Sequence, residues 1–185
     1  MLDTKKAELN YLNFLTDLVK LALKSGADSV DTIAVSSSSL NVSQRLGRKE
    51  DLERSESNNI GLRVFVGKKQ AIVSSVISKN NDNQEIIERA ISMAKVTPED
   101  PFSSIVNKEN LAKEWPDLNL LDEQEPSPDE LYELASRAED SALSNKEITN
   151  SEGAEASWSI TTVALATSEG FKGAYSGSSF GISTS

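Results

Sequence analysis

The sequence has 185 residues, no histidine, no cysteine and a formal net charge of −10. A chain without imidazole or thiol groups cannot supply a Ser-His-Asp triad, a histidine-ligated zinc site or a thiolate nucleophile. The acidic balance repels the phosphate backbone, so direct nucleic-acid binding is not expected.

The chain also lacks the apolar segments that direct proteins to membranes. No apolar run approaches the ~18 residues that suggest a membrane span, and the start, Met1 to Glu8, has no segment of the signal-peptide kind. Together with the missing cysteines, this favours a cytoplasmic protein. The acidic excess is uneven: residues 1–80 hold 12 Lys and Arg against 9 Asp and Glu, and residues 81–185 hold 7 against 20.

The first elements are a helix and a series of short strands. Residues 5–25 show apolar positions at three- and four-residue spacing and end at Ser25-Gly26, which predicts an amphipathic helix with Gly26 in a left-handed position. Residues 30–39 and 40–46 are expected to form two strands separated by a serine-rich bend. The polar residues 48–57 are interpreted as an exposed edge strand whose charges discourage pairing.

A β-hairpin is predicted at about residues 60–78, after a turn at Asn58-Asn59. Both of its arms carry apolar residues on both faces, so we expect a central pair of strands covered on both sides. Together with the preceding strands, the hairpin makes a meander of about five strands.

Two further helices follow, at about residues 83–96 and 128–145. Asp82 is a plausible N-cap of the first, and Ser127, followed by proline, opens the second. Between them, residues 98–126 form a long acidic connection with four of the five prolines; such connections usually wrap a surface or serve a function. After residue 147 the chain is rich in Ser and Gly and reads as short strands with a hairpin turn at Glu169-Gly170.

These elements predict an α+β fold with a largely antiparallel sheet, three helices packed against it and a second strand group after residue 147. We expect a helix-meander-helix unit at 1–97, the connection at 98–126, and a helix with strands at 127–185. Because Phe180 to Ser185 resembles the interior of a strand, we expect residues 1–185 to be the N-terminal region of a longer protein.

The motifs with possible chemistry do not assign a catalytic, cofactor-binding or metal-binding residue. Gly177-Ser178-Ser179-Phe180-Gly181 matches the Gly-x-Ser-x-Gly nucleophile elbow, but that motif needs a following helix and a histidine. Glu147, Glu152, Glu155 and Glu169 share no predicted face and are interpreted as solvated acids. Lys68-Lys69 is interpreted as a solubilising turn.

Several segments resemble the TldD/PmbA family, and specifically its PmbA branch, in the order that the family has them. They are Gly61 to Ala71 with Ser74-Ser75, Val96 to Pro101, Pro116-Asp117-Leu118, Ser127 to Glu130, Glu133 to Glu139, and Ile148 to Gly153.

The resemblance implies a cytoplasmic bacterial-type modulator of DNA gyrase classed with the metallopeptidases. Such proteins resemble subunits of an oligomeric protease that processes peptide precursors and degrades small unfolded proteins, threaded in as extended strands. The zinc motif, His-Glu-x-x-x-His, belongs to the TldD-like partner subunit, so no cofactor is expected in this segment. The alternative is a non-enzymatic peptide-binding or scaffold domain that works by strand addition.

Overall fold

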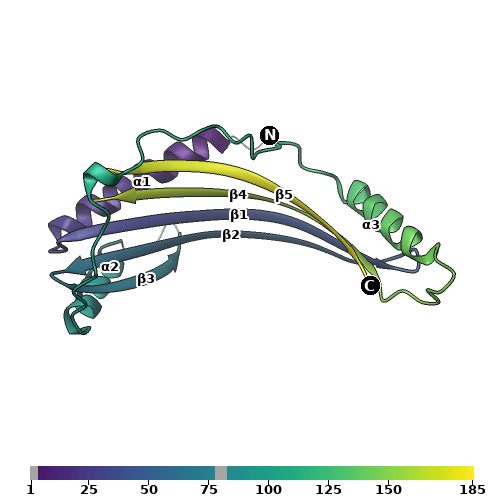
Figure 1. Ribbon diagram of the computed structural model, residues 1–185, viewed down its shortest axis with the longest axis horizontal. Helices are drawn as coiled ribbons and strands as arrows, with labels where there is room; N and C mark the ends of the chain where they lie inside the picture. The colour runs from purple at the N-terminus through teal and green to yellow at the C-terminus, as the bar shows by residue number, and fades with distance from the viewer. Residues whose placement is uncertain (1–3, 78–82) are drawn as a thin grey trace.

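The computed structural model describes residues 4–77 and 83–185, and within them it shows an α+β fold, as expected (Figure 1). In chain order the elements are α1 (Thr4–Lys24), β1 (Ser29–Arg45), β2 (Arg48–Val66), β3 (Lys69–Val76), α2 (Asn83–Val96), a 3₁₀ turn (Lys108–Asn110), α3 (Pro128–Leu143), β4 (Ala154–Thr167) and β5 (Lys172–Thr184). The five strands form one antiparallel sheet in the order β3-β2-β1-β4-β5.

The first two strands are longer than the sequence suggests. β1 has 17 residues and β2 has 19, and they pair from Ser29 opposite Phe65 to Arg45 opposite Arg48. The expected bend after Ser39 and the expected turn at Asn58-Asn59 are therefore wrong. Serine and asparagine favour turns because their side chains bond the local backbone, but here the ladders satisfy that backbone instead.

The β2–β3 hairpin lies at one end of the strand order, which corrects the expectation of a central, doubly covered pair. Among the described strands β3 has a neighbour on one side only, and its Ile72 and Val76 are 63% and 60% exposed. The strands after residue 147 pair with β1 and so extend the same sheet.

All three helices contact one face of the sheet, which we call the helix face; the opposite side is the open face. Buried residues alternate along β1 and β4, and Val30, Ala34 and Leu40 are among those on the helix face. Helices α1 and α2 cover one end of this arched sheet and α3 covers the other (Figure 1).

The helix face carries two separate cores. The larger core joins α1 and α2 to β1, β2, β3 and β4 and includes Leu15, Leu62 and Ile87. The smaller core lies under α3 and is centred on Trp158 and Leu131. One sheet thus supports two groups of helices that do not share a core.

The helices agree with the predicted ends. Gly26 has a φ of 106°, and the helix at 128–143 begins with a capping box in which Glu130 N donates to Ser127 Oγ at 3.2 Å and Ser127 N donates to Glu130 Oε2 at 2.7 Å. The Asp82 cap lies outside the described residues. None of the described helices is long and apolar enough to cross a membrane.

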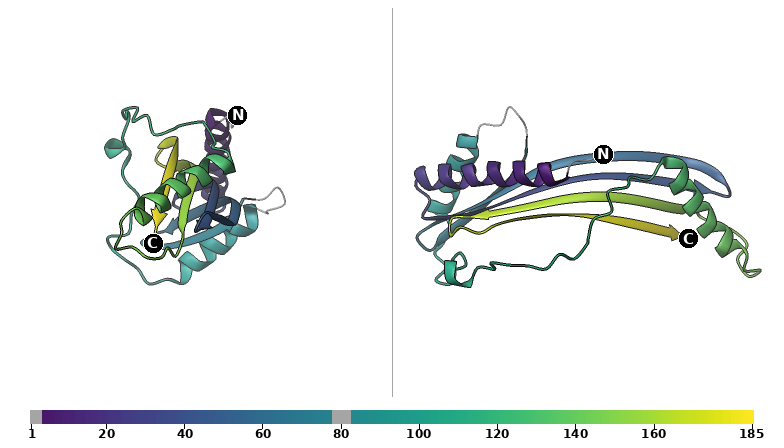
Figure 2. Two further views of the ribbon diagram at one scale, coloured as in Figure 1. Left: turned by 90° about the vertical axis from the view of Figure 1, so that its right-hand side faces the viewer. Right: turned by 90° about the horizontal axis from the view of Figure 1, so that it is seen from above.

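The first part of the connection between α2 and α3 runs along the open face and the outer edge of β5, on the other side of the sheet from α1 (Figure 2). Its last residues reach the helix face, where Leu121 packs against the core under α3 and Glu125 pairs with Arg54 of β2. The Trp115 and Phe171 ring centroids are 6.0 Å apart, and Ser178 N donates to Leu120 O at 3.0 Å. The connection therefore wraps a surface, as its length suggests.

One-sided coverage of the hairpin can be tested with two isoleucines. Ile60 is 3% exposed in the larger core and Ile72 is 63% exposed on the open face. We expect Ile60→Ala to lower the free energy of unfolding by about 2–5 kcal/mol and Ile72→Ala by about 0.5 kcal/mol or less. Urea unfolding measures both, and equal losses would contradict one-sided coverage.

Candidate functional site

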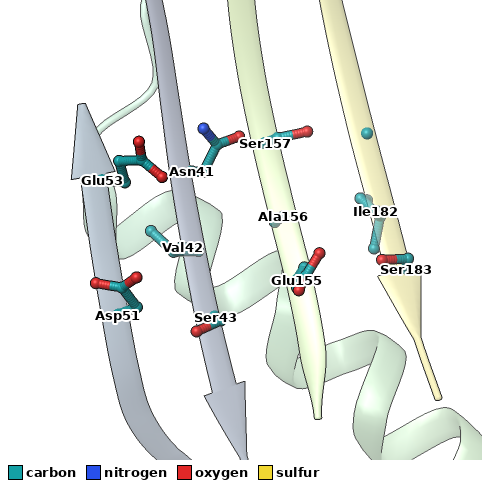
Figure 3. Close-up of a pocket in the computed structure, with 11 residues that line it drawn as sticks. Asn41, Val42, Ser43, Asp51, Glu53, Glu155, Ala156, Ser157, Ile182 and Ser183 are labelled. Atoms are coloured by element: carbon teal, nitrogen blue, oxygen red, sulfur yellow. The ribbon is translucent and has the colours of Figure 1, made fainter. Parts of the chain in front are cut away.

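A groove of about 460 Å³ lies on the sheet at the end covered by α3 (Figure 3). Four neighbouring strands, β2, β1, β4 and β5, supply its walls and floor. The lining residues are Asn41, Val42, Ser43, Asp51, Glu53, Glu155, Ala156, Ser157, Gly181, Ile182 and Ser183. Helix α3 lies behind the sheet in this view, so the groove opens on the face that the helices leave uncovered.

Strand register brings the acidic residues together from distant parts of the chain. Ser43 pairs with Asp51 on β2 and with Glu155 on β4, so it has a carboxylate on each side. In the next row on the same face, Asn41 pairs with Glu53 and with Ser157. Directly opposed residues of antiparallel strands have Cβ atoms about 4.5–5.5 Å apart, so each row is a line of adjacent side chains.

The groove presents uncompensated negative charge beside small polar groups. Asp51 Oδ1 accepts a hydrogen bond from Leu52 N at 2.9 Å, and among the described residues no ion pair involves Asp51, Glu53 or Glu155. Carboxylate, hydroxyl and amide groups in this arrangement can bind a cationic or hydrogen-bonding ligand.

The described residues do not supply hydrolytic machinery. The sequence has no histidine or cysteine, and the described part of the chain contains no group of three or more Asp and Glu residues placed to hold a metal ion. These residues therefore do not fit a histidine- or cysteine-ligated zinc site, and we treat the groove as a candidate binding site.

The Gly-x-Ser-x-Gly pattern and the four glutamates considered in the sequence analysis do not come together at one site in the structure. Residues 177–181 lie entirely within β5, so the nucleophile-elbow pattern is a strand segment. Of the four glutamates, Glu155 lies in the groove, whereas Glu169 lies in the β4–β5 turn at the other end of β4. Glu147 and Glu152 lie between α3 and β4.

Sequence reasoning missed Asp51 and Glu53. Their spacing of two along a strand, which places both side chains on one face, was the available signal. The charged hairpin tip also has a structural contact: Lys69 Nζ donates to Lys95 O at the end of α2 at 3.1 Å.

The buried carboxylate of Glu139 accepts hydrogen bonds from the backbone of the nearby β1–β2 turn. Glu139 of α3 is 1% exposed. It accepts hydrogen bonds from Ser151 Oγ at 2.6 Å, Leu46 N at 2.9 Å, and Gln44 Nε2 and Gly47 N at 3.2 Å. This one side chain therefore joins the turn, α3 and the segment before β4.

Two opposing effects act on the pKa of Glu139. Burial raises the pKa because it disfavours the charged form, whereas the hydrogen bonds from Ser151, Leu46, Gly47 and Gln44 lower it. The hydrogen bonds prevail, so the pKa of Glu139 lies below its ordinary value and the group is ionised at neutral pH.

The same turn holds a leucine in an unfavourable backbone conformation. Leu46 has a φ of 50° and is followed by Gly47 at 72°. Left-handed backbone costs a residue with a β-carbon roughly 1–2 kcal/mol. Glu139 offsets this cost by accepting from both backbone N–H groups of the turn.

Glu139→Gln is expected to lower the free energy of unfolding at pH 7 by on the order of 2 kcal/mol, because it removes charge-assisted hydrogen bonds. When folding lowers the pKa of a carboxyl group, the folded protein is stabilised at pH values above the unfolded-state pKa of that group, ~4.3 for Glu. This stabilisation is lost as the pH falls through the folded-state pKa. The gap between wild type and variant should therefore narrow below about pH 4 in denaturant titrations. Glu133→Gln, an exposed site on the same helix, is the control; a gap independent of pH would contradict the assignment.

Leu46→Asn is expected to raise the free energy of unfolding by about 0.5–1 kcal/mol, because asparagine tolerates the left-handed conformation and Asn-Gly suits this type of hairpin turn. Leu52→Asn is the matched control, since Leu52 is similarly exposed, at 51% against 55%, but lies within a strand. Thermal or urea unfolding compares the two variants. No gain at position 46 would show that the turn carries no strain.

Comparison with known proteins identifies the family. Residues 30–94 match the PmbA/TldA metallopeptidase domain 1, and residues 121–185 match the PmbA/TldA metallopeptidase central domain. Metalloprotease PmbA of Escherichia coli O157:H7 is 36% identical over 135 residues, covering 72% of this chain and 30% of the relative. A Metalloprotease PmbA homolog of Haemophilus influenzae is 30% identical over 168 residues, covering 90% of this chain and 37% of the relative.

Solved structures share the fold at lower identity. A protein described as a modulator of DNA gyrase from Bacteroides thetaiotaomicron has a TM-score of 0.79 and 18% identity, covering 92% of this chain and 39% of that one. TldE from Thermococcus kodakarensis has a TM-score of 0.72 and 18% identity, covering 90% and 37%. The chain thus spans between 30% and 39% of the length of these proteins. By its two family matches it belongs to the TldD/PmbA family of metallopeptidases.

Proposed function

We propose that this chain is part of a cytoplasmic TldD/PmbA-type metallopeptidase complex, in which it contributes assembly and substrate handling while a TldD-like partner subunit carries the catalytic zinc. The single observation that carries the proposal is membership of a metallopeptidase family combined with a sequence that contains no histidine. By its resemblance to the family, the complex processes peptide precursors and degrades small unfolded proteins.

The open side of the molecule supports a role in assembly. Phe102 and Leu118 of the connection are 90% and 66% exposed, and Tyr175 of β5 is 55% exposed. Burial of exposed apolar side chains against a partner is favourable. The proposed oligomer, with a TldD-like subunit and with further copies of this chain, would cover such residues.

The groove supports a role in substrate handling. Its charge and its small hydroxyl side chains suit an extended peptide, which offers backbone hydrogen bonds along its whole length and cations where it carries lysine or arginine. The acidic balance of the chain argues against nucleic acid as a direct partner.

The proposal can be tested by mixing the purified protein with a TldD-type subunit that bears His-Glu-x-x-x-His. We expect the two to co-purify, zinc to accompany only the partner, and peptide cleavage to require the mixture. Replacing the glutamate of that motif in the partner is the control and should abolish cleavage without affecting co-purification. Tightly held stoichiometric zinc in this protein alone, or cleavage by it alone, would contradict the proposal.

A second candidate is a peptide-binding or scaffold domain that works by strand addition without any protease. It is favoured by one feature, the stretch of β2 that no described strand borders on its outer side. Peptide binding that persists while no metal-bearing subunit associates would favour this candidate.

A further inference from the structure

The sheet has a border where its backbone is open to an incoming strand. β3 pairs only with residues 59–66 of β2, so residues 48–58 have β1 on one side and no described strand on the other. At the opposite border, β5 already receives the connection through Leu120 and Ser178. The β2 border, defined as residues 52–57, is therefore the more accessible one.

One hydrogen bond shows which residues of this border direct their backbone N–H and C=O groups away from β1. Ile77 N donates to Asn58 O at 2.8 Å, so the backbone groups of Asn58 point outward. Because these groups alternate along a strand, those of Glu56, Arg54 and Leu52 also point outward. Leu52 N is occupied by Asp51 Oδ1, whereas the N–H and C=O groups of Arg54 and Glu56 have no partner among the described residues.

We propose that the β2 border binds an extended, basic peptide by strand addition, in the line of β3. This inference rests on the proposed role in substrate handling and deepens it by naming the binding site and the chemistry of the peptide. Two adjacent outward-pointing residues can exchange up to four backbone hydrogen bonds with such a peptide, which gives affinity without dependence on its sequence.

The charges on the open face select basic side chains. Glu53 belongs to the β2 border and Asp51 lies immediately before it, and both line the β2 side of the groove (Figure 3). Side chains of an added strand that face the same way would lie about 4.5–5.5 Å from them. Neither acid has an ion-pair partner in the described part of the chain. At this acidic border, a second copy of this chain, with its net charge of −10, is a less favourable occupant than a basic peptide.

The helix face of the same border favours apolar side chains at the alternate positions. Leu52 is 51% exposed there. The cation of Arg54 is neutralised by Glu125, with Nη1 at 2.5 Å from Oε1, and by Glu56 at 3.5 Å, so it does not repel a basic peptide. The expected ligand therefore alternates basic and apolar residues.

The probe is a fluorescein-labelled acetylated peptide amide with four Lys-Val repeats, and the control probe has four Glu-Val repeats. Binding is measured by fluorescence anisotropy. Glu56→Pro removes one outward N–H and leaves the ladder to β1 intact, because position 56 points away from β1. Glu56→Ala, which loses the same carboxylate but keeps the N–H, is the reference for the side-chain effect. We expect Glu56→Pro to bind the Lys-Val peptide about fivefold or more weakly than Glu56→Ala does.

A second measurement needs no variant, so it decides the question even where Glu56→Pro does not fold. Hydrogen exchange at the amides of Arg54 and Glu56 should slow when the Lys-Val peptide saturates the protein. The same peptide with N-methylated valines should bind at least about fivefold more weakly, since methylation removes its hydrogen-bond donors.

Equal affinity for the Lys-Val and Glu-Val probes, or an affinity unchanged by N-methylation, would overturn the proposal. So would protection of Arg54 and Glu56 that rises with protein concentration in the absence of peptide, because that marks pairing between copies. The proposed function is tested separately by co-purification and by cleavage in the presence of the metal-bearing subunit. Loss of border binding alone therefore leaves the assembly role intact, and failure to associate leaves the border result intact.

Discussion

The structure depends on the antiparallel pairing of β1 with β4. Residues Asp31 to Gln44 pair with Thr167 to Ala154, and at one end Thr32 Oγ1 donates to Ala166 O at 3.0 Å. A two-stranded hairpin such as β4–β5 is marginal on its own. The segments that match the first and the central domain of the family therefore share one sheet, and neither half completes its own hydrophobic core.

The long sheet exceeds what one helical layer can cover, and small polar residues fill the interval between the two cores. On the helix face, Thr162 Oγ1 lies 2.9 Å from Ser176 Oγ, which in turn donates to Glu8 Oε1 of α1 at 2.6 Å. Both hydroxyls are buried, and such groups are tolerated when they are hydrogen-bonded. The serine-rich stretch is therefore not a loop. It is the part of the sheet that lies between the two hydrophobic cores.

The helices could be predicted from sequence because their signals are local. Ser127 and Glu130 lie within one turn of each other, and the apolar spacing of α1 repeats along a single segment. The lengths of β1 and β2 could not be predicted, since Asn58-Asn59 has turn propensity and is kept extended by pairing with Ser36 and Val35 on one side and by contacts with the end of β3 on the other. Tertiary pairing there overrides local preference.

The groove was still harder to foresee, because it needs register between separate strands. Glu155 reaches Asp51 only through Ser43, which pairs with both, and a shift of one residue in either pairing would turn a carboxylate to the other face. Glu139 was missed for a related reason. A glutamate at a helical position between apolar residues looks like a surface acid until the β1–β2 turn supplies two N–H donors to it.

In the proposed complex, this subunit holds the substrate and the metal-bearing partner cleaves it. The carboxylates of the groove have no imidazole beside them, because the sequence contains no histidine. They can still orient a cationic chain, and in a two-subunit protease orientation lowers the barrier by removing the entropy of positioning the scissile bond. Under the proposed division of labour, the β2 border would supply sequence-independent affinity and the acids would supply preference for basic chains. Selection then depends on whether a peptide can become extended, which distinguishes unfolded chains from folded ones.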